Sequence, residues 1–179
     1  MAVKILYYVH STTVDNENKR ASGWNETLLS EKGMNQAQDL AKIVKNEKID
    51  IVICSDLIRA VESAKIVFKD TGKKIHQDER LRECNYGELN GKDSKLIEYI
   101  NHIENPFPGG ESLKTVEKRV EILLEELKQK YEGKTVAIMA HRATQLAIEV
   151  LTQNKTWEEA IATDWRNTKD WKPGWEYTL

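Results

Sequence analysis

Two histidines in this chain directly follow apolar segments that are typical of buried strands. His10 comes after the β-branched and aromatic segment at residues 3–9, and His141 after the apolar segment at 135–140. A single histidine at a strand end is more often structural, but the ends of neighbouring strands lie only about 4.8 Å apart, so two imidazoles can meet on one small anion. A neutral imidazole is a suitable nucleophile near pH 7. The pair therefore favours nucleophilic chemistry on a small anionic group.

An arginine and a glutamate complete a set of residues that can cleave a phosphoryl ester. Arg59 lies one turn into the helix expected after residues 50–54, and Glu83 lies in a polar connection. Phosphoryl transfer depends mainly on positive charge and hydrogen-bond donors placed around a loose transition state. The leaving alkoxide also needs a proton, which a carboxylic acid can deliver and later recover as a base toward water. Glu83 could do this, although a loop glutamate is more often a solvated carboxylate.

The elements that must position these side chains alternate between strand and helix. Strands separated by helices imply right-handed parallel crossovers. We therefore expect a three-layer α/β/α sandwich with a mostly parallel central sheet and with the ligand at the carboxyl ends of the strands. The predicted strands are 3–9, 50–54, 75–77 and 135–140.

Apolar residues that recur every three or four positions predict the helices between these strands. Ser30 is a natural N-cap for the first helix, and Ser55 and Asp56 are expected to cap the second. The segment 106–112 is expected to be a loop that ends in a cap for a long amphipathic helix. The apolar helical faces lie within 37–44, 57–68, 116–127 and 143–151, with a weak helix near 96–100.

Composition and charge narrow the class of protein. The chain has 179 residues, with 27 basic and 29 acidic side chains and 40% hydrophobic residues, which suits a single globular domain over residues 1–179. Nothing predicts nucleic-acid or membrane binding, because charges of one sign form no long block and the N-terminal apolar run is too short for a membrane span. Cys54 and Cys84 form no metal or disulfide pattern. We expect reduced thiols in the cytoplasm, and the oligomeric state stays open.

Short motifs along the chain follow one another in an order typical of one enzyme family. They are, in sequence, His10-Ser11-Thr12-Thr13, Asn16, Arg20, Ser22-Gly23-Trp24, Leu29-Ser30-Glu31-Lys32-Gly33, Gln36-Ala37, Ser55-Asp56-Leu57-Ile58-Arg59-Ala60, Arg80-Leu81-Arg82-Glu83, Tyr86-Gly87, Gly110-Glu111-Ser112, Arg119-Val120 and Ala140-His141. Over about residues 3–151 the chain thus resembles the histidine phosphatase and phosphoglycerate mutase superfamily. The remaining segment, 152–179, is rich in Trp and is expected to pack on the same domain, where it covers the pocket or completes the core.

The resemblance implies a role for each matching residue. His10 would form a phosphohistidine, and Glu83 would act as acid and base. The phosphoryl oxygens would be bound by Arg59, His141 and Asn16. The rest of a small phosphorylated substrate would face Arg20, Ser22, Gly23 and Tyr86. The resemblance implies no metal and no organic cofactor.

The family signature begins Arg-His-Gly, whereas this chain has Val9-His10-Ser11. The absent arginine would supply two parallel, charge-assisted hydrogen bonds from its guanidinium group to the phosphate. Removal of one such donor can lower a catalytic rate roughly a hundred- to a thousandfold. Arg142 would restore that charge if its guanidinium group turns into the pocket, but an arginine that faces solvent is at least as common. The Ser11 hydroxyl is a further candidate donor to phosphate.

Hydrolysis of a small phosphate monoester is the favoured function. A catalytically weak or inactive phospho-ligand binding homologue is the alternative, because of Val9. Phosphoglycerate mutase activity is a minor alternative, since only about 30 residues separate Glu83 from the next long helix. A cysteine-dependent phosphatase is disfavoured, because four residues rather than five separate Cys54 from Arg59 and none of them is Gly.

Overall fold

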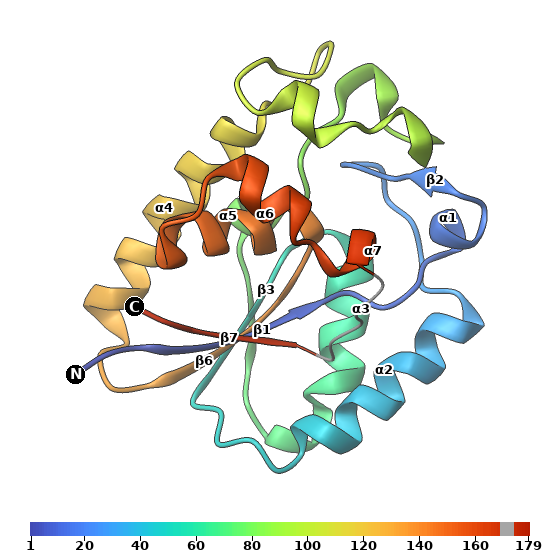
Figure 1. Ribbon diagram of the computed structural model, residues 1–179. Helices are drawn as coiled ribbons and strands as arrows, with labels where there is room; N and C mark the ends of the chain where they lie inside the picture. The colour runs from blue at the N-terminus through green and yellow to red at the C-terminus, as the bar shows by residue number, and fades with distance from the viewer. Residues whose placement is uncertain (169–173) are drawn as a thin grey trace.

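The computed structural model describes residues 1–168 and 174–179, which form a central sheet with helices on both faces (Figure 1). The sheet has five strands in the order β4-β3-β6-β1-β7. The first four of these strands are parallel to their neighbours, and β7 is antiparallel to β1. The predicted α/β/α sandwich with a mostly parallel sheet is therefore confirmed. The strands are β1 (Lys4–Val9), β3 (Ile51–Cys54), β4 (Ile75–Gln77), β6 (Thr135–Ala140) and β7 (Trp175–Thr178).

Two groups of helices cover the two faces of this sheet. The helices α2 and α3 pack against each other on one face, while α4 and α5 pack together on the other, where α6 lies beside α5. Short helices α1 and α7 lie near the carboxyl ends of the strands (Figure 1). The bounds are α1 (Val14–Glu17), α2 (Glu31–Val44), α3 (Ile58–Val67), α4 (Leu113–Lys130), α5 (Arg142–Gln153), α6 (Trp157–Ala162) and α7 (Trp165–Thr168).

The alternation of side chains along the central strands builds a separate core on each face. In β1, Ile5 and Tyr7 enter the core under α4 and α5, whereas Leu6 and Tyr8 enter the core under α2 and α3. Successive residues of a strand point to opposite faces, so a strand covered on both faces must be apolar throughout. This requirement explains the continuous apolar runs that predict β1 and β6.

The hydrogen bonds at the starts of the helices confirm two of the predicted caps and correct a third. The Ser30 hydroxyl accepts a hydrogen bond from the Gly33 amide, 3.2 Å away, at the start of α2. The Ser112 hydroxyl does the same for the first turn of α4. The prediction that Ser55 and Asp56 cap α3 is wrong, because the amide of Ile58 donates instead to the Glu26 carboxylate at 2.9 Å. A partner distant in the sequence replaces the local cap.

The connections between β4 and α4 are irregular, which the sequence predicts only in part. A second, two-stranded sheet pairs β2 (Arg20–Ala21) with β5 (Lys92–Asp93) and was not predicted. The weak helix expected near 96–100 is present as two separate 3₁₀ turns. The 3₁₀ turns are Lys69–Thr71, Glu79–Leu81, Gly87–Leu89, Ser94–Leu96 and Tyr99–His102.

The Trp-rich segment contributes to the core and to the sheet. Trp157, at the start of α6, is 2% exposed. Trp175 opens β7 and packs edge-on against Tyr7, with ring centroids 6.4 Å apart. Both tryptophans thus complete the core. Trp171, which the sequence also places in this segment, lies outside the described residues.

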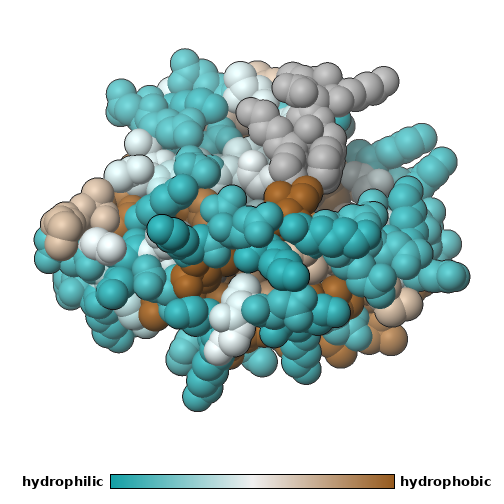
Figure 2. Space-filling view, turned by 90° about the horizontal axis from the view of Figure 1, so that it is seen from below, coloured by the Kyte–Doolittle hydropathy of each residue, from teal (hydrophilic) through white to brown (hydrophobic). Residues whose placement is uncertain are grey.

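The surface gives few clues to function. Figure 2 shows one face covered mainly by hydrophilic side chains, with hydrophobic ones scattered among them, a pattern that is normal for protein surfaces. Within the described part of the chain, every helix is too short or too polar to cross a membrane. The candidate site is instead the cavity at the carboxyl ends of the strands.

Candidate active site

A cavity of about 420 Å³ lies at the carboxyl ends of β1, β3 and β6 and contains most of the predicted site residues. Ligands in open α/β sheets usually bind at this edge. Nine of the eleven predicted residues line the cavity, and Ser11 and His141 do not. The nine are His10, Asn16, Arg20, Ser22, Gly23, Arg59, Glu83, Tyr86 and Arg142.

His10 is held in one tautomer. Its Nδ1 atom lies 2.8 Å from the carbonyl oxygen of Ser11, and a carbonyl can only accept, so Nδ1 must carry the hydrogen. The lone pair is then on Nε2. Burial, followed by the nearby charge of Arg59, lowers the pKa of His10 from 6.5 to about 3. His10 thus presents a neutral, nucleophilic imidazole at neutral pH.

His141 lies next to His10 and is the more deeply buried of the two. Its side chain is fully buried, and the two imidazole centroids are 5.1 Å apart. The Tyr7 hydroxyl fixes the backbone here, because it donates to the His141 carbonyl at 2.8 Å and accepts from the His141 amide at 3.1 Å. Neither ring nitrogen of His141 has a hydrogen-bond partner among the described residues. Burial, together with Arg59, holds the pKa of His141 well below its usual value.

Arg59 lies on α3 and forms hydrogen bonds with the loop that contains Gly23 and Asn25. Its guanidinium group is almost fully buried and donates to the carbonyls of Gly23 at 2.7 Å and Asn25 at 3.1 Å. Gly23 has a positive φ of 55°, and a Cβ at this position would lie 1.8 Å from the Asn90 side-chain oxygen. Only glycine fits this turn, which explains why the loop can bring its carbonyls to Arg59.

Glu83 is buried, and both of its carboxylate oxygens accept hydrogen bonds. The expectation that a loop glutamate is a solvated carboxylate is therefore wrong for this residue. Oε1 accepts hydrogen bonds from the amides of Cys84 at 2.8 Å and Ala143 at 3.0 Å, and from the Tyr99 hydroxyl at 3.2 Å. Oε2 accepts one longer bond, of 3.2 Å, from the Arg142 amide. The amides of Arg142 and Ala143 belong to the first turn of α5. The positive end of that helix dipole therefore helps to hold the carboxylate in the cavity wall.

Tyr99 is a residue of the site that the sequence analysis missed. Its hydroxyl lies between Glu83 and the hydroxyl of Tyr86, 2.8 Å from the latter. Since Tyr99 donates to Glu83, Tyr86 is left to donate to Tyr99. Burial, and next the negative charge of Glu83, raise the pKa of both phenols. Tyr99 lies in an irregular segment, where no periodic pattern distinguishes it.

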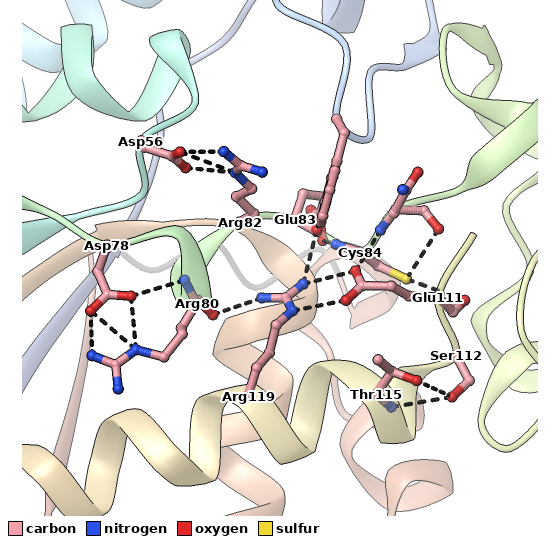
Figure 3. A network of polar contacts seen from close by, with 12 residues as sticks. Asp56, Asp78, Arg80, Arg82, Glu83, Cys84, Glu111, Ser112, Thr115 and Arg119 are labelled. Carbon is pink, nitrogen blue, oxygen red and sulfur yellow. Dashed lines mark hydrogen bonds and ion pairs between the residues drawn. The ribbon is translucent and has the colours of Figure 1, made fainter. Parts of the chain in front are cut away.

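Arg119 fixes the segment that carries Glu83, as Figure 3 shows. Its guanidinium group forms a two-bond ion pair with Glu111, with both bonds 3.0 Å long. It also donates to the carbonyls of Arg80 at 2.7 Å and Glu83 at 3.0 Å. From the same segment, Arg82 pairs with Asp56 at the end of β3. The motifs around Glu111 and Arg119 thus have a structural function.

The remaining predicted substrate-binding residues differ in their bonding. Ser22 is buried and donates to the Asp15 carboxylate at 2.8 Å. The Asn16 side-chain oxygen accepts from the Thr13 amide at 3.0 Å, which caps α1. Arg20 is exposed at the rim of the cavity. All three residues line the cavity, where Asn16 and Arg20 are exposed and Ser22 is buried.

Ser11 lies on the other side of His10. It lines a neighbouring cavity of about 340 Å³, and its amide donates to the Ser63 hydroxyl at 3.0 Å. Its contribution to His10 is the backbone carbonyl that fixes the imidazole tautomer. The structure therefore does not bring the Ser11 hydroxyl, a predicted phosphate donor, to the cavity of Glu83 and Arg59.

Arg142 turns toward the cavity rather than toward solvent. Its Nε donates to the Asp164 carboxylate at 2.6 Å, and its guanidinium carbon lies 4.5 Å from the centre of the Tyr99 ring. The same carboxylate accepts a bond of 2.9 Å from Arg166, which also lines the cavity beside Trp165. Trp165 thus places part of the Trp-rich segment at the cavity, one of the two expectations for that segment. Asp164 and Arg166 lie in the same segment, beyond the resemblance over residues 3–151, and no motif identifies them from the sequence.

The environment of Cys54 supports the exclusion of a cysteine-dependent phosphatase. Its side chain is fully buried in the core under α2 and α3. Burial, followed by the charge of Asp56, raises the pKa of the thiol to about 12. A thiol in this state is not a nucleophile at neutral pH.

Removal of the Arg119 guanidinium group should destabilise the protein. In an Arg119→Ala variant, the Glu111 carboxylate, whose side chain is only 13% exposed, loses its ionic partner, so we expect the free energy of unfolding to fall by about 3 kcal/mol in chemical denaturation. Lys128→Ala is the matched control, because Lys128 lies on the same helix and its ion pair with Glu125 is exposed, so the substitution should cost less than about 1 kcal/mol. Equal losses in the two variants would contradict the assigned structural function.

The His10 imidazole should remain neutral well below pH 6.5 in the free protein. Its folded pKa of about 3 lies below its ordinary value of 6.5, so the unfolded chain binds more protons between these pH values. The stability contributed by this shift is complete above about pH 6.5 and is lost as the pH falls toward 3. Imidazole NMR titration, assigned with His10→Ala, measures this pKa. A midpoint near 6.5 would contradict a lowering of this pKa by desolvation and by the charge of Arg59.

Comparison with known proteins finds the same family that the sequence motifs resemble. The model of the histidine phosphatase superfamily (branch 1) matches residues 8–174. A 2,3-bisphosphoglycerate-dependent phosphoglycerate mutase from Parvibaculum lavamentivorans is 32% identical over 175 residues, covering 86% of this chain and 83% of that protein. Phosphoserine phosphatase 1 from Hydrogenobacter thermophilus is 27% identical over 169 residues, covering 87% of this chain and 80% of that protein.

The fold also matches that of a solved structure. The native mycobacterial glucosyl-3-phosphoglycerate phosphatase superposes with a TM-score of 0.80 at 24% sequence identity, covering 90% of this chain and 84% of that chain. The family match includes both strand-end histidines, Arg59 and Glu83, and extends into the Trp-rich segment as far as residue 174. The chain therefore belongs to the histidine phosphatase superfamily, branch 1.

Proposed function

We propose that this protein hydrolyses small phosphate monoesters through a phosphohistidine intermediate on His10. The observation that carries the proposal is the bond from His10 Nδ1 to the Ser11 carbonyl, which leaves the Nε2 lone pair of a neutral imidazole for attack. Arg59 and Glu83 line the same cavity as this imidazole. The site thus combines a nucleophile, positive charge and a carboxyl group around a space for one small substrate.

In the first step, Nε2 of His10 attacks phosphorus, and the bond between phosphorus and the ester oxygen breaks. Glu83, in its protonated form, gives its proton to the leaving alkoxide. Oε2 suits this transfer, because among the described residues it accepts only one long bond, from the Arg142 amide. Arg59, which lines the cavity, stabilises the phosphoryl oxygens as charge develops on them. The resemblance implies the same role for His141, whose buried ring lies outside the cavity lining with its centroid 5.1 Å from that of His10.

In the second step, water attacks the phosphohistidine. The Glu83 carboxylate now takes a proton from that water, the bond between phosphorus and Nε2 breaks, and inorganic phosphate leaves. His10 and protonated Glu83 are thereby restored, so atoms and protons balance over the cycle. None of these steps draws on a metal or an organic cofactor.

The rest of the substrate would contact the wall formed by Asn16, Arg20, Ser22, Gly23 and Tyr86. A cavity of about 420 Å³ suits a small phosphorylated metabolite. The name of the relative from Hydrogenobacter thermophilus supports phosphatase activity, and that of the Parvibaculum lavamentivorans relative keeps a mutase as the minor alternative.

Val9 favours a second candidate function, binding of a phosphorylated ligand without efficient turnover. This residue lines the cavity next to His10 and brings no charge to the phosphate. A missing donor of this kind can lower a rate by roughly a hundred- to a thousandfold while binding persists. The two candidates differ in whether the natural chain releases phosphate.

Hydrolysis of p-nitrophenyl phosphate separates these functions. We expect the natural chain to turn over, His10→Ala to lose activity by more than about a thousandfold, and Val9→Arg to gain activity because it adds a donor beside the phosphoryl group. His76→Ala is the matched control, since His76 is exposed on β4, and should match the natural chain. Activity only in Val9→Arg would select the binding function, and full activity in His10→Ala would reject the mechanism. A phosphorylated product from 3-phosphoglycerate would select the mutase.

A further inference from the structure

Two arginines in the cavity wall share one buried carboxylate. Arg142 opens α5 and Arg166 lies in α7, so they come from separate elements. Each donates to a different oxygen of Asp164, Arg142 to Oδ2 and Arg166 to Oδ1. The Asp164 side chain is 0% exposed, whereas those of Arg142 and Arg166 are 25% and 23% exposed. The carboxylate is therefore hidden behind two cations that reach the cavity.

The charges in this cluster do not balance. Two guanidinium groups meet one carboxylate, which leaves a net positive charge at the cavity wall. Within the described chain, Arg142 uses only Nε and Arg166 only Nη1 among their side-chain N–H groups for hydrogen bonds. The other N–H groups of both side chains bind no described residue, and a partly buried cation with donors of this kind favours an anion.

Both guanidinium groups are also held in place by aromatic rings. Arg142 lies over Tyr99, and Arg166 lies over Trp165 at 4.6 Å from the ring centre. Contacts with an aromatic face and a carboxylate restrict the rotamers of a long side chain before a ligand binds. Such prior ordering is what a donor needs in order to stabilise a transition state.

Arg166 lines the cavity that carries the nucleophile. His10, Val9, Trp165 and Arg166 line the same cavity, and the charge of Arg166 contributes to the lowered pKa of His10. The strand end itself brings no cation, because Val9 is apolar. Arg166 can therefore add a positive charge near His10 from α7 rather than from β1.

We infer that Arg166, oriented by Asp164, is a further anion-binding residue of this site and contacts the transferred phosphoryl group. This inference rests on the proposed phosphatase function. It assigns the α7 segment to transition-state stabilisation rather than to recognition of a second charged group on the substrate. Arg142 shares the same carboxylate and completes the positively charged wall.

The test uses Arg166→Ala in the full chain with two substrates and one inhibitor. p-Nitrophenyl phosphate has no second anionic group, whereas O-phosphoserine has a carboxylate. We expect kcat/KM to fall about a hundredfold for both substrates, and the affinity for vanadate, a phosphoryl-transfer analogue, to fall similarly. Asn167→Ala is the matched control, because Asn167 lies in the same short helix and does not line the cavity.

Other outcomes would overturn the inference. A loss confined to O-phosphoserine would assign Arg166 to the substrate carboxylate, and unchanged kinetics with unchanged vanadate affinity would remove it from the site. Equal losses of kcat/KM and of vanadate affinity in Arg166→Ala and Asn167→Ala would mean that Arg166 only stabilises α7. Vanadate affinity is measured by isothermal titration, so this result stands even if the natural chain shows no turnover and the proposed phosphatase function fails.

Discussion

The parallel pairing of β1 with β6 is the interaction on which the geometry of the site depends. The register places Val9 opposite Ala140, and the His10 amide continues the ladder with a 3.0 Å bond to the Ala140 carbonyl. Each histidine is the next residue after its strand, so the two imidazoles are adjacent. A shift by one residue would turn every side chain of β1 to the opposite face, so Tyr7 would leave the core under α4 and α5 and its hydroxyl would lose the His141 backbone groups that it binds. Core packing thus sets the distance between the histidines.

Glu83 connects this sheet edge to the irregular segments above it. Its carboxylate binds the first amides of α5, the helix that follows His141, while its carbonyl is bound by Arg119. The carboxyl group therefore sits between an element of the core and a segment held by the ion pair of Arg119 with Glu111. Displacement of either one would move the proposed proton donor away from His10. Stability and chemistry are coupled at this residue.

The sequence predicts the fold and the core of the site because burial imposes local periodic patterns on strands and helices. His10 and His141 could be placed for the same reason. The cap of α3 by Glu26 could not be predicted, since it depends on a contact between distant residues. The direction of Arg142 is also set at long range, by a carboxylate 22 residues further along the chain. Tyr99 and Arg166 lie in segments without periodicity, so no local signal identifies them.

The most direct test of the account is to trap the covalent intermediate. The natural chain would be mixed with a ³²P-labelled phosphate monoester, quenched in alkali within milliseconds, digested and mapped by mass spectrometry. The account predicts an acid-labile, alkali-stable phosphoryl group on the peptide that contains His10, and none in His10→Ala. Hydrolysis that proceeds without any labelled His10 peptide, or a label on another residue, would contradict it.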